Sequence, residues 1–297
     1  MPHHSGFVAV LGRPNVGKST LVNALVGEKI SIVTSKPNTT RHAILGVLSR
    51  SDWQIIFIDT PGLTDKQQRL IDKAMNRAAT GALVGANIVL FMVEAGVWST
   101  ADKGALQLIK QSGLECILAV NKIDKIKPKE KLLPYLQARA AEHDYLEVVP
   151  LSALGSDNLE VLAQQIAMHL PIEDPLYPAE MLTDKGIQFR VAEVVREKLM
   201  DSLRQELPYG VGVEIELLED TPERLNVSAI VWVGRESHKG IVIGPGGKAI
   251  KHVGQSARLD LQAILQRKVH LETLVKVKRN WADNAQWIQQ LGYGSME

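Results

Sequence analysis

The chain has 297 residues, which suits two domains that each bury a core of their own. Its formal net charge of +1 excludes any argument from bulk charge, so a polyanionic partner would need a local basic patch. One cysteine excludes an internal disulfide, and the polar start of the chain does not resemble a signal peptide, so we expect a cytosolic protein.

Residues 7 to 170 alternate apolar, β-branched runs with helical segments. We expect strands at 7–11, 44–50, 53–59, 88–93, 116–120 and 146–151, and helices near 66–85, 101–112, 129–142 and 157–170. This alternation predicts an α/β domain, in which a mostly parallel six-stranded sheet carries helices on both faces. The Ser51-Asp52 turn between the second and third strands predicts a hairpin, and therefore one antiparallel edge strand.

Three prolines, Pro171, Pro175 and Pro178, end the alternation and favour an extended connector. Beyond it we expect a helix near 187–204, strands at 211–218 and 225–234, a helix near 247–266, a strand at 269–277 and an amphipathic helical stretch at 281–291. The changed order predicts a separate, smaller α+β domain. The predicted division is a first domain at 1–171, a linker at 172–186 and a second domain at 187–297.

The most specific motif follows the first strand and reads Gly12-Arg13-Pro14-Asn15-Val16-Gly17-Lys18-Ser19-Thr20. Its setting between a strand and a helix is that of a phosphate-binding loop. The glycines allow successive N–H groups to converge on phosphate oxygens, next to the positive end of the following helix. We expect Lys18 to reach the β- and γ-phosphates and the Ser19 hydroxyl to bind Mg²⁺.

A second motif, Asp59-Thr60-Pro61-Gly62, ends the strand at 53–59. An aspartate at this place can hold Mg²⁺ through water, and the Gly62 N–H can meet the γ-phosphate. Taken alone, the pattern describes a common turn. Its distance from the phosphate loop, with a strand directly before it, favours the nucleotide-binding interpretation.

A third motif, Asn121-Lys122-Ile123-Asp124, specifies the base. The Asp124 carboxylate can accept hydrogen bonds from guanine N1–H and the exocyclic amine, whereas adenine would leave it unpaired. We expect the Lys122 stem to lie over the base and Asn121 to brace the phosphate loop. In the following segment, Ser152-Ala153-Leu154, the Ala153 N–H can donate to guanine O6. These elements, in this order at strand ends, predict a GTP-binding domain.

A further set of residues concerns hydrolysis of the nucleotide. We expect Lys18, Thr40, Asp59, Gly62 and Asn15 to contribute to GTP hydrolysis. In the polar loop at 32–42 we favour Thr40 over Thr39 as the Mg²⁺ ligand. The same loop also fits an ordinary solvated turn. Leu63 occupies the position at which Ras-like enzymes carry a water-orienting glutamine. Asn15 indicates either a K⁺ ion between the phosphates or simply a stabilised loop.

The second domain contains a Gly-x-x-Gly element, Gly244-Pro245-Gly246-Gly247, which opens a helix that we expect to follow an apolar strand. Such glycines let a single-stranded RNA backbone approach closely, although a helix-capping turn is the more common explanation. Residues 235–280 carry ten Lys or Arg and only three Asp or Glu, which favours RNA. The expected RNA contacts are Gly244, Pro245, Gly246, Gly247, Lys248, Ile250, Lys251, Arg258, Lys276 and Lys278.

Together these motifs resemble the bacterial Era family of GTPases over nearly the whole chain. The resemblance implies a P-loop GTPase domain followed by a type II K-homology (KH) domain, with GTP and GDP as substrate and product and Mg²⁺ as cofactor. It implies binding to 16S rRNA near its 3′ end during 30S subunit assembly, and partial peripheral association with the inner face of the cell membrane. We also expect a monomer. The alternative is a GTP-switched scaffold whose second domain docks a protein or a membrane.

Overall fold

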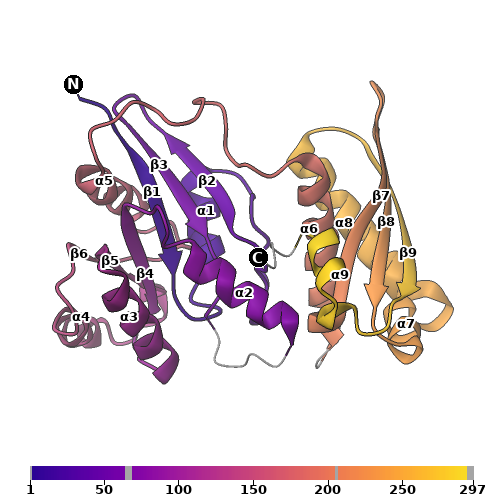
Figure 1. Cartoon of the computed structure of the whole chain (residues 1–297), viewed down its shortest axis with the longest axis horizontal. Coiled ribbons are helices and arrows are strands. Elements are labelled where there is room, and N and C mark those ends of the chain that lie inside the picture. The colour runs from indigo at the N-terminus through magenta and orange to yellow at the C-terminus, as the bar shows by residue number, and fades with distance from the viewer. Residues whose placement is uncertain (1, 64–68, 205–206, 293–297) are drawn as a thin grey trace. The chain divides into compact units, whose positions relative to one another are not determined.

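The computed structural model describes residues 2–63, 69–204 and 207–292, and these divide into two compact units (Figure 1). The first unit holds residues up to 31, 40–63 and 75–184. The second holds 32–39, 69–74 and 185 onward. The domain boundaries at 171 and 187 stay a prediction.

The first unit is built on a sheet of six strands: β1 (His4–Leu11), β2 (Ile44–Ser49), β3 (Trp53–Asp59), β4 (Ile88–Glu94), β5 (Glu115–Asn121) and β6 (Glu147–Pro150). Their spatial order is β2-β3-β1-β4-β5-β6. Strands β2 and β3 pair antiparallel, and the other described neighbours pair parallel. The predicted mostly parallel sheet with an antiparallel edge strand is therefore confirmed.

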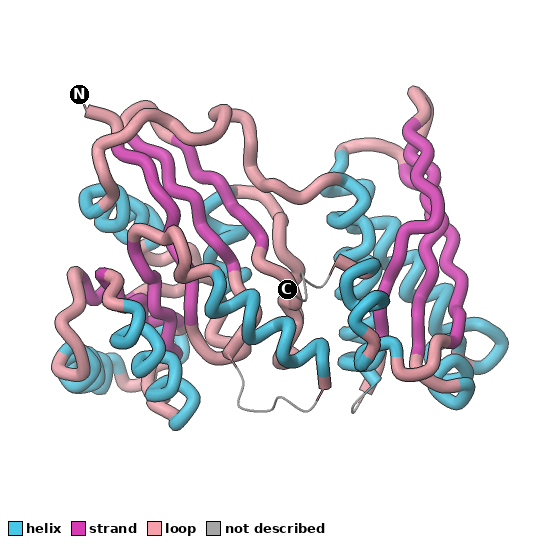
Figure 2. Tube along the Cα trace, in the orientation of Figure 1, coloured by secondary structure: helices cyan, strands magenta, loops and turns pink. Residues whose placement is uncertain are grey.

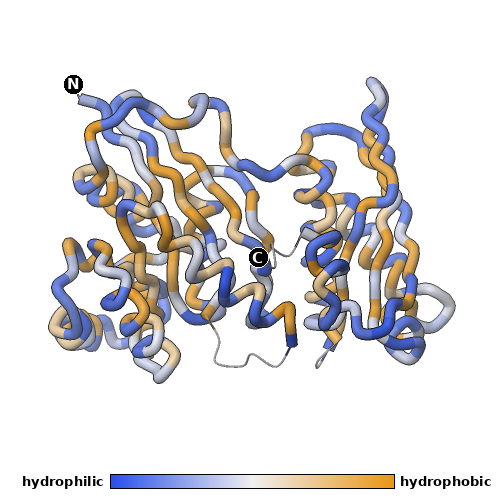
Figure 3. The backbone as a smooth tube through the Cα atoms, viewed as in Figure 1, coloured by the Kyte–Doolittle hydropathy of each residue, from blue (hydrophilic) through white to orange (hydrophobic). Residues whose placement is uncertain are grey.

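Helices cover both faces of this sheet: α1 (Lys18–Val26), α3 (Thr100–Ser112), α4 (Leu132–Ala140), α5 (Leu159–His169) and the part of α2 (Leu70–Gly81) from Met75 onward. Helices α1 and α5 contact each other on one face, and α3 and α4 pack over an apolar cluster on the other. Strands covered on both faces need apolar residues along most of their length. Figure 3 shows this hydrophobic character in the first sheet.

Two predicted helices of the first unit are shorter than expected. The stretch at 66–85 is helical only from Leu70 to Gly81, and a turn follows through Gly85, whose φ of 84° favours glycine. Residues 64–68 lie outside the described residues. The stretch at 129–142 begins with a 3₁₀ turn at Lys129–Lys131 before α4.

The second unit contains α6 (Ile187–Ser202), β7 (Val211–Asp220), β8 (Leu225–Val233), α7 (Glu236–Ile243), α8 (Lys248–Leu265), β9 (Val269–Val277) and α9 (Ala285–Gln290). Its three strands, seen in Figure 2, have the order β7-β8-β9, antiparallel and then parallel. Apolar residues of α6 and α8, such as Val195 and Val253, are buried against one sheet face. This is the predicted α+β domain of the KH type.

One helix of this unit was not expected. Residues 236–243 form α7, so the Gly-x-x-Gly element joins two helices and does not follow a strand. The β-branched run Ile241-Val242-Ile243 is typical of a strand, but Val242 is buried in the core from a helical turn. Tertiary burial of that side chain outweighs the local β preference.

Helix α6 also carries a buried cluster of charges. Arg196 has no exposed surface, and its Nε donates to Glu193 Oε1 at 2.7 Å, while its Nη2 donates to the Thr39 carbonyl at 2.6 Å. The Val33 N–H donates to Glu197 Oε1 at 3.0 Å. The segment Ile32–Thr39 is thereby held within the second unit.

Across the three described ranges, no helix combines the length and the apolar character needed to cross a bilayer.

Candidate nucleotide-binding and RNA-binding sites

The phosphate loop connects β1 to α1, and two of its glycines cannot be replaced without displacing neighbours. Gly12 has a φ of 155°, and a Cβ there would lie 2.4 Å from the Met92 carbonyl oxygen. Gly17 has a φ of 105°, and a Cβ there would lie 2.3 Å from Asn121 Nδ2. The chain therefore needs glycine at both positions, and it packs the loop directly against β4 and β5.

Lys18 lies inside the loop and is 6% exposed. Its Nζ donates to the carbonyl oxygens of Gly12 at 3.0 Å and Arg13 at 3.2 Å. Burial lowers the pKa of Lys18 to about 8, although the nearby Asp59 carboxylate opposes this shift. An amine in such surroundings gains from any anion that enters the loop, because a phosphate would supply the missing counter-charge.

Three oxygen-bearing side chains predicted to bind Mg²⁺ converge next to the loop. Ser19 Oγ donates to Asp59 Oδ2 at 2.7 Å and lies 2.8 Å from Thr40 Oγ1. Asp59 is fully buried, and within the described ranges its Oδ1 accepts no hydrogen bond. Burial raises the pKa of Asp59, although the Ser19 hydrogen bond and Lys18 oppose this shift. Hydroxyl and carboxylate oxygens are the ligands that Mg²⁺ prefers, so these residues fit the ion.

The geometry also distinguishes the two candidate threonines. Thr40 Oγ1 meets Ser19, whereas the Thr39 hydroxyl donates to the Lys36 carbonyl at 2.7 Å and pairs with Thr34 Oγ1 at 2.7 Å. Of the two threonines, Thr40 therefore shares the oxygen cluster.

The residues after Asp59 pack closely against the phosphate loop. The Thr60 hydroxyl donates to the Val10 carbonyl at 2.7 Å, and a Cβ on Gly62 would lie 2.7 Å from Pro14. Leu63 packs against the apolar cluster of the first unit. A leucine side chain has no group that could orient water, so the water-orienting group is not provided at this position.

Asn121 braces the phosphate loop as predicted. It is 1% exposed, its Nδ2 donates to the Val16 carbonyl at 2.8 Å, and its Oδ1 accepts from the Lys122 N–H at 2.7 Å. The same Oδ1 accepts the Ala153 N–H at 2.9 Å. The Ala153 donor that we expected to be available for guanine O6 is thus bonded to Asn121 in this structure.

Asp124 is exposed, and its Oδ1 accepts a hydrogen bond from Ser152 Oγ at 2.6 Å. Lys122 adopts a φ of 65°, and its Nζ donates to the Asn15 carbonyl at 2.6 Å. The Asp124 carboxylate of the base motif is therefore accessible, and the Lys122 stem extends from its own loop to the phosphate loop. Leu154 is also exposed, whereas Ile123 packs against the apolar cluster of the first unit.

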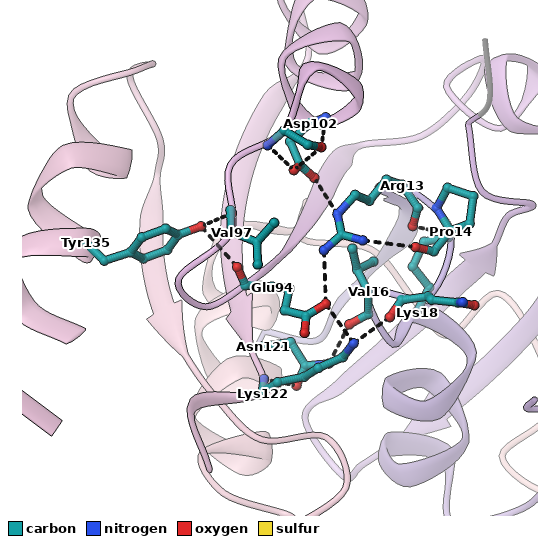
Figure 4. A network of polar contacts seen from close by, with 12 residues as sticks. Arg13, Pro14, Val16, Lys18, Glu94, Val97, Asp102, Asn121, Lys122 and Tyr135 are labelled. Atoms are coloured by element: carbon teal, nitrogen blue, oxygen red, sulfur yellow. Dashed lines mark hydrogen bonds and ion pairs between the residues drawn. The ribbon is translucent and has the colours of Figure 1, made fainter. Parts of the chain in front are cut away.

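The sequence did not direct attention to three residues that support the site (Figure 4). Glu94 ends β4, Asp102 caps α3, and the Tyr135 hydroxyl donates to the carbonyls of Glu94 at 3.1 Å and Val97 at 2.6 Å. Glu94 lies opposite Asn121 in the parallel register. Because carboxyl ends of parallel strands meet at one edge, a charged residue ending β4 was the available signal.

In the second unit, the Gly-x-x-Gly element forms the tight connection between α7 and α8. Gly244, Gly246 and Gly247 have φ values of 71°, 59° and 74°, and a Cβ on Gly244 would lie 2.7 Å from that of Ala249. Among the described residues, and leaving aside the adjacent backbone, no heavy atom lies within 4 Å of a Cβ placed on Gly246 or Gly247, so the space beside them is open. An extended backbone could approach there closely.

The candidate RNA residues do not all lie together. Lys248, Lys251 and Arg258 are exposed on α8, whereas Ile250 is partly buried against the core of the unit. Lys276 Nζ instead donates to Glu216 Oε1 at 3.2 Å.

Lys276 lies elsewhere because the side chains of a strand alternate between the two faces of its sheet. Val275 and Val277 pack into the core beside the helices, so Lys276 points to the opposite face, where it lies 5.9 Å from the Trp232 ring. Lys278 lies over Trp287, 4.7 Å from the ring centroid. The count of basic residues over 235–280 thus included residues from two separate surfaces.

A phosphate loop, a buried Asp-x-x-Gly carboxylate and an Asn-Lys-x-Asp motif on a mostly parallel sheet, followed by a KH fold, define a P-loop GTPase with a KH domain. Comparison with known proteins agrees. The family model "50S ribosome-binding GTPase" matches residues 7–122, and the "KH domain" model matches residues 206–282.

Among curated relatives, GTPase Era of Stenotrophomonas maltophilia is 44% identical over 292 residues, covering 98% of both chains. GTPase Era of Marinobacter nauticus is 44% identical, covering 97% of this chain and 94% of that one. The solved structure of a point variant of Aquifex aeolicus Era bound to GDP·AlF₄⁻ superposes with a TM-score of 0.94 at 38% identity, covering 98% and 99% of the two chains. The chain belongs to the Era family, and it is a GTPase.

A solved structure of Era in complex with MgGDPNP and nucleotides 1506–1542 of 16S ribosomal RNA is similar to the same degree. It gives a TM-score of 0.94 and 38% identity, and it covers 98% of this chain.

Proposed function

We propose that this GTPase uses its nucleotide state to control binding of 16S rRNA, near the 3′ end, by the second unit. The observation that carries the proposal is the open Gly-x-x-Gly turn flanked by the exposed cations Lys248 and Lys251, in a chain whose first unit has a complete guanine-nucleotide motif set. The Era–rRNA complex supports the same partner.

Within the first unit, we assign Ser19, Thr40 and Asp59 to Mg²⁺. Bound there, the ion would neutralise charge that develops on the β- and γ-phosphates. Lys18 would hold those phosphates, the Gly62 N–H would meet the γ-phosphate, and Asp124 with Lys122 would hold the base. Removing Mg²⁺ with a chelator should therefore lower the GTP turnover rate.

A K⁺ ion is a further proposal for hydrolysis. It is supported by Asn15 within the phosphate loop and by leucine, in place of a water-orienting glutamine, at position 63. GTP turnover should be faster in KCl than in NaCl at equal ionic strength. Asn15 has a φ of 64°, so Asn15→Gly removes the amide without backbone strain. This variant should bind GTP but lose the K⁺ preference. Equal wild-type rates in both salts would contradict the proposal.

The RNA proposal is tested with the full chain and a single-stranded RNA of the 16S 3′-terminal sequence. Gly246→Asp should abolish binding, because it adds negative charge beside the approaching phosphates. Gly246→Asn is the matched control: it has nearly the same shape and tolerates the φ of 59°, but it is neutral. If the two variants bind RNA equally well, charge at this turn does not act on RNA.

The alternative is a second unit that docks a protein or a membrane instead of RNA. Under this alternative, the protein should bind the 3′-terminal RNA weakly, and the wild type and both variants should bind it with the same affinity. The family resemblance supports the remaining proposals: a role in 30S assembly, a monomeric state, and a cytoplasmic location with a fraction on the inner face of the membrane.

A further inference from the structure

The carboxylate of Glu94 joins two cations that come from different nucleotide-binding motifs (Figure 4). Its Oε2 accepts a hydrogen bond from Lys122 Nζ at 2.9 Å and another from Arg13 Nη2 at 3.0 Å. Lys122 belongs to the base motif, and Arg13 belongs to the phosphate loop. One oxygen therefore links the two subsites of the nucleotide.

The place of Glu94 in the sheet fixes this link. It is the last residue of β4, and it pairs in parallel register with Asn121, the residue directly before Lys122. The Ala95 N–H donates to the Asn121 carbonyl at 2.8 Å, and the Tyr135 hydroxyl holds the Glu94 carbonyl. Both the backbone and the carboxylate of Glu94 are thus held by contacts within the protein.

The lysine is held at two points. Its Nζ donates to the Asn15 carbonyl as well as to Glu94, so the aliphatic stem is stretched across the region where the base is expected. A free lysine side chain loses considerable rotamer entropy when it becomes ordered. Contacts within the protein that anchor its end reduce the part of that cost that nucleotide binding must meet.

Arg13 is held on its other side by Asp102, whose carboxylate lies 3.4 Å from Arg13 Nε and is fully buried. Asp102 also accepts the Ser99 N–H at 2.8 Å and forms the capping box of α3. The side chains of Glu94, Arg13 and Lys122 are 19 to 22% exposed, so their charges are partly sheltered from water.

Glu94 is ionised at neutral pH in these surroundings. Burial alone raises the pKa of its carboxyl, but the hydrogen bonds and charges of Lys122 and Arg13 outweigh burial and hold the pKa below the ordinary value. Both cations therefore face a full negative charge.

We infer that Glu94 is a positioning residue for the guanine nucleotide: it holds the Lys122 stem over the base and ties the phosphate loop to the base motif. The inference rests on the proposed role of Lys122 at the base. In this role Glu94 acts through Lys122 and Arg13.

The test uses the full chain and measures GDP dissociation with a fluorescent GDP analogue, together with kcat and KM for GTP. In Glu94→Gln an uncharged amide replaces the carboxylate, so the hydrogen bonds from Lys122 and Arg13 lose their charge assistance. GDP should therefore dissociate about ten- to a hundredfold faster, and KM for GTP should rise. The kcat should change much less, because the Mg²⁺ ligands are untouched. The matched control is Glu115→Gln, which removes an exposed charge at the start of β5 and should leave both quantities unchanged.

A double-mutant cycle separates positioning from general stabilisation. Lys122→Met keeps an apolar stem but removes Nζ, so the losses from Glu94→Gln and Lys122→Met should be strongly non-additive. Additive losses, or wild-type GDP dissociation in Glu94→Gln, would overturn the inference. If Glu94→Gln does not fold, Glu94→Asp keeps the charge on a shorter arm and should show an intermediate loss, and wild-type behaviour there would overturn the inference as well.

The base assignment has its own control. If Asp124→Ala leaves GDP affinity unchanged, the proposed base site is wrong and the inference falls with it. If Asp124→Ala weakens binding while Glu94→Gln does not, the base site stands and only the role of Glu94 is wrong.

Discussion

Replacing Asn121 by alanine tests how the phosphate loop and the base motif are held together. The side chain is 1% exposed and makes three hydrogen bonds, to the Val16 carbonyl and to the N–H groups of Lys122 and Ala153. Alanine would remove all three hydrogen bonds. Because water has better access to Lys122, the main penalty falls on the buried residues Val16 and Ala153.

Each buried polar group that loses its partner costs about 1–3 kcal/mol, so the two together cost about 2–6 kcal/mol of unfolding free energy. For a unit of this size, such a loss lowers the unfolding temperature by roughly 5–20 °C. Differential scanning calorimetry measures the shift. The transition of the first unit is the one that added GDP moves to higher temperature, since a ligand stabilises the unit that binds it.

Two further variants sharpen this test. Gln107→Ala removes an exposed amide from α3 and should leave the transition nearly unchanged. Asn121→Asp keeps the acceptor for both N–H groups but turns an oxygen toward the Val16 carbonyl, so it isolates the loss of the bond to the phosphate loop. If Asn121→Ala unfolds at the same temperature as Gln107→Ala, the three hydrogen bonds do not hold the site together and the reasoning is wrong.

Three further predictions concern charge. Asp124→Ala removes an acceptor for two guanine N–H groups, so affinity for GTP and GDP in calorimetric titration should fall about a hundredfold or more; a loss below about threefold would exclude this carboxylate as the base ligand. Burial lowers the pKa of Lys18 to about 8 from 10.5, so the unfolded chain binds more protons than the folded one between these values. The unfolding free energy of the nucleotide-free first unit, measured by urea titration, should therefore rise with pH across that window. Outside the window, the slope of unfolding free energy against pH should be the same for the wild type and Lys18→Met. Identical slopes inside the window would refute the pKa shift. Lys248→Ala should weaken RNA binding and reduce the slope of log affinity against log salt concentration by about 1, whereas Lys268→Ala, which removes the same charge at another exposed position, should not; equal slopes would place the RNA elsewhere.

The nucleotide site could be predicted from the sequence because its motifs are short and each one follows a strand. Parallel strands bring their carboxyl ends to one edge, so Ser19, Asp59 and Asn121 had to lie near one another once the sheet was predicted. Thr40 was preferred over Thr39 within the loop at 32–42, and the contact between Thr40 and Ser19 supports that preference.

The RNA surface was harder to predict, because counting charges along a chain does not say which face they occupy. Lys276 and Lys251 contribute equally to the basic count, yet Lys276 alternates away from the helices of its sheet and pairs with Glu216. Helix α7 was missed for a related reason, since burial of Val242 is a property of the folded core and not of its neighbours in sequence.

Glu94 shows what motif reasoning leaves out. Motifs name the groups that touch a ligand, but the position of those groups depends on residues that touch only the protein. Lys122 meets both Asn15 and Glu94, and Asn121 meets Val16, so the base motif and the phosphate loop are joined by contacts that would all shift together. Nucleotide binding at the base motif should therefore also affect the phosphate loop. A change at Glu94 should therefore alter the residence time of GDP, because Glu94 holds both Lys122 and Arg13.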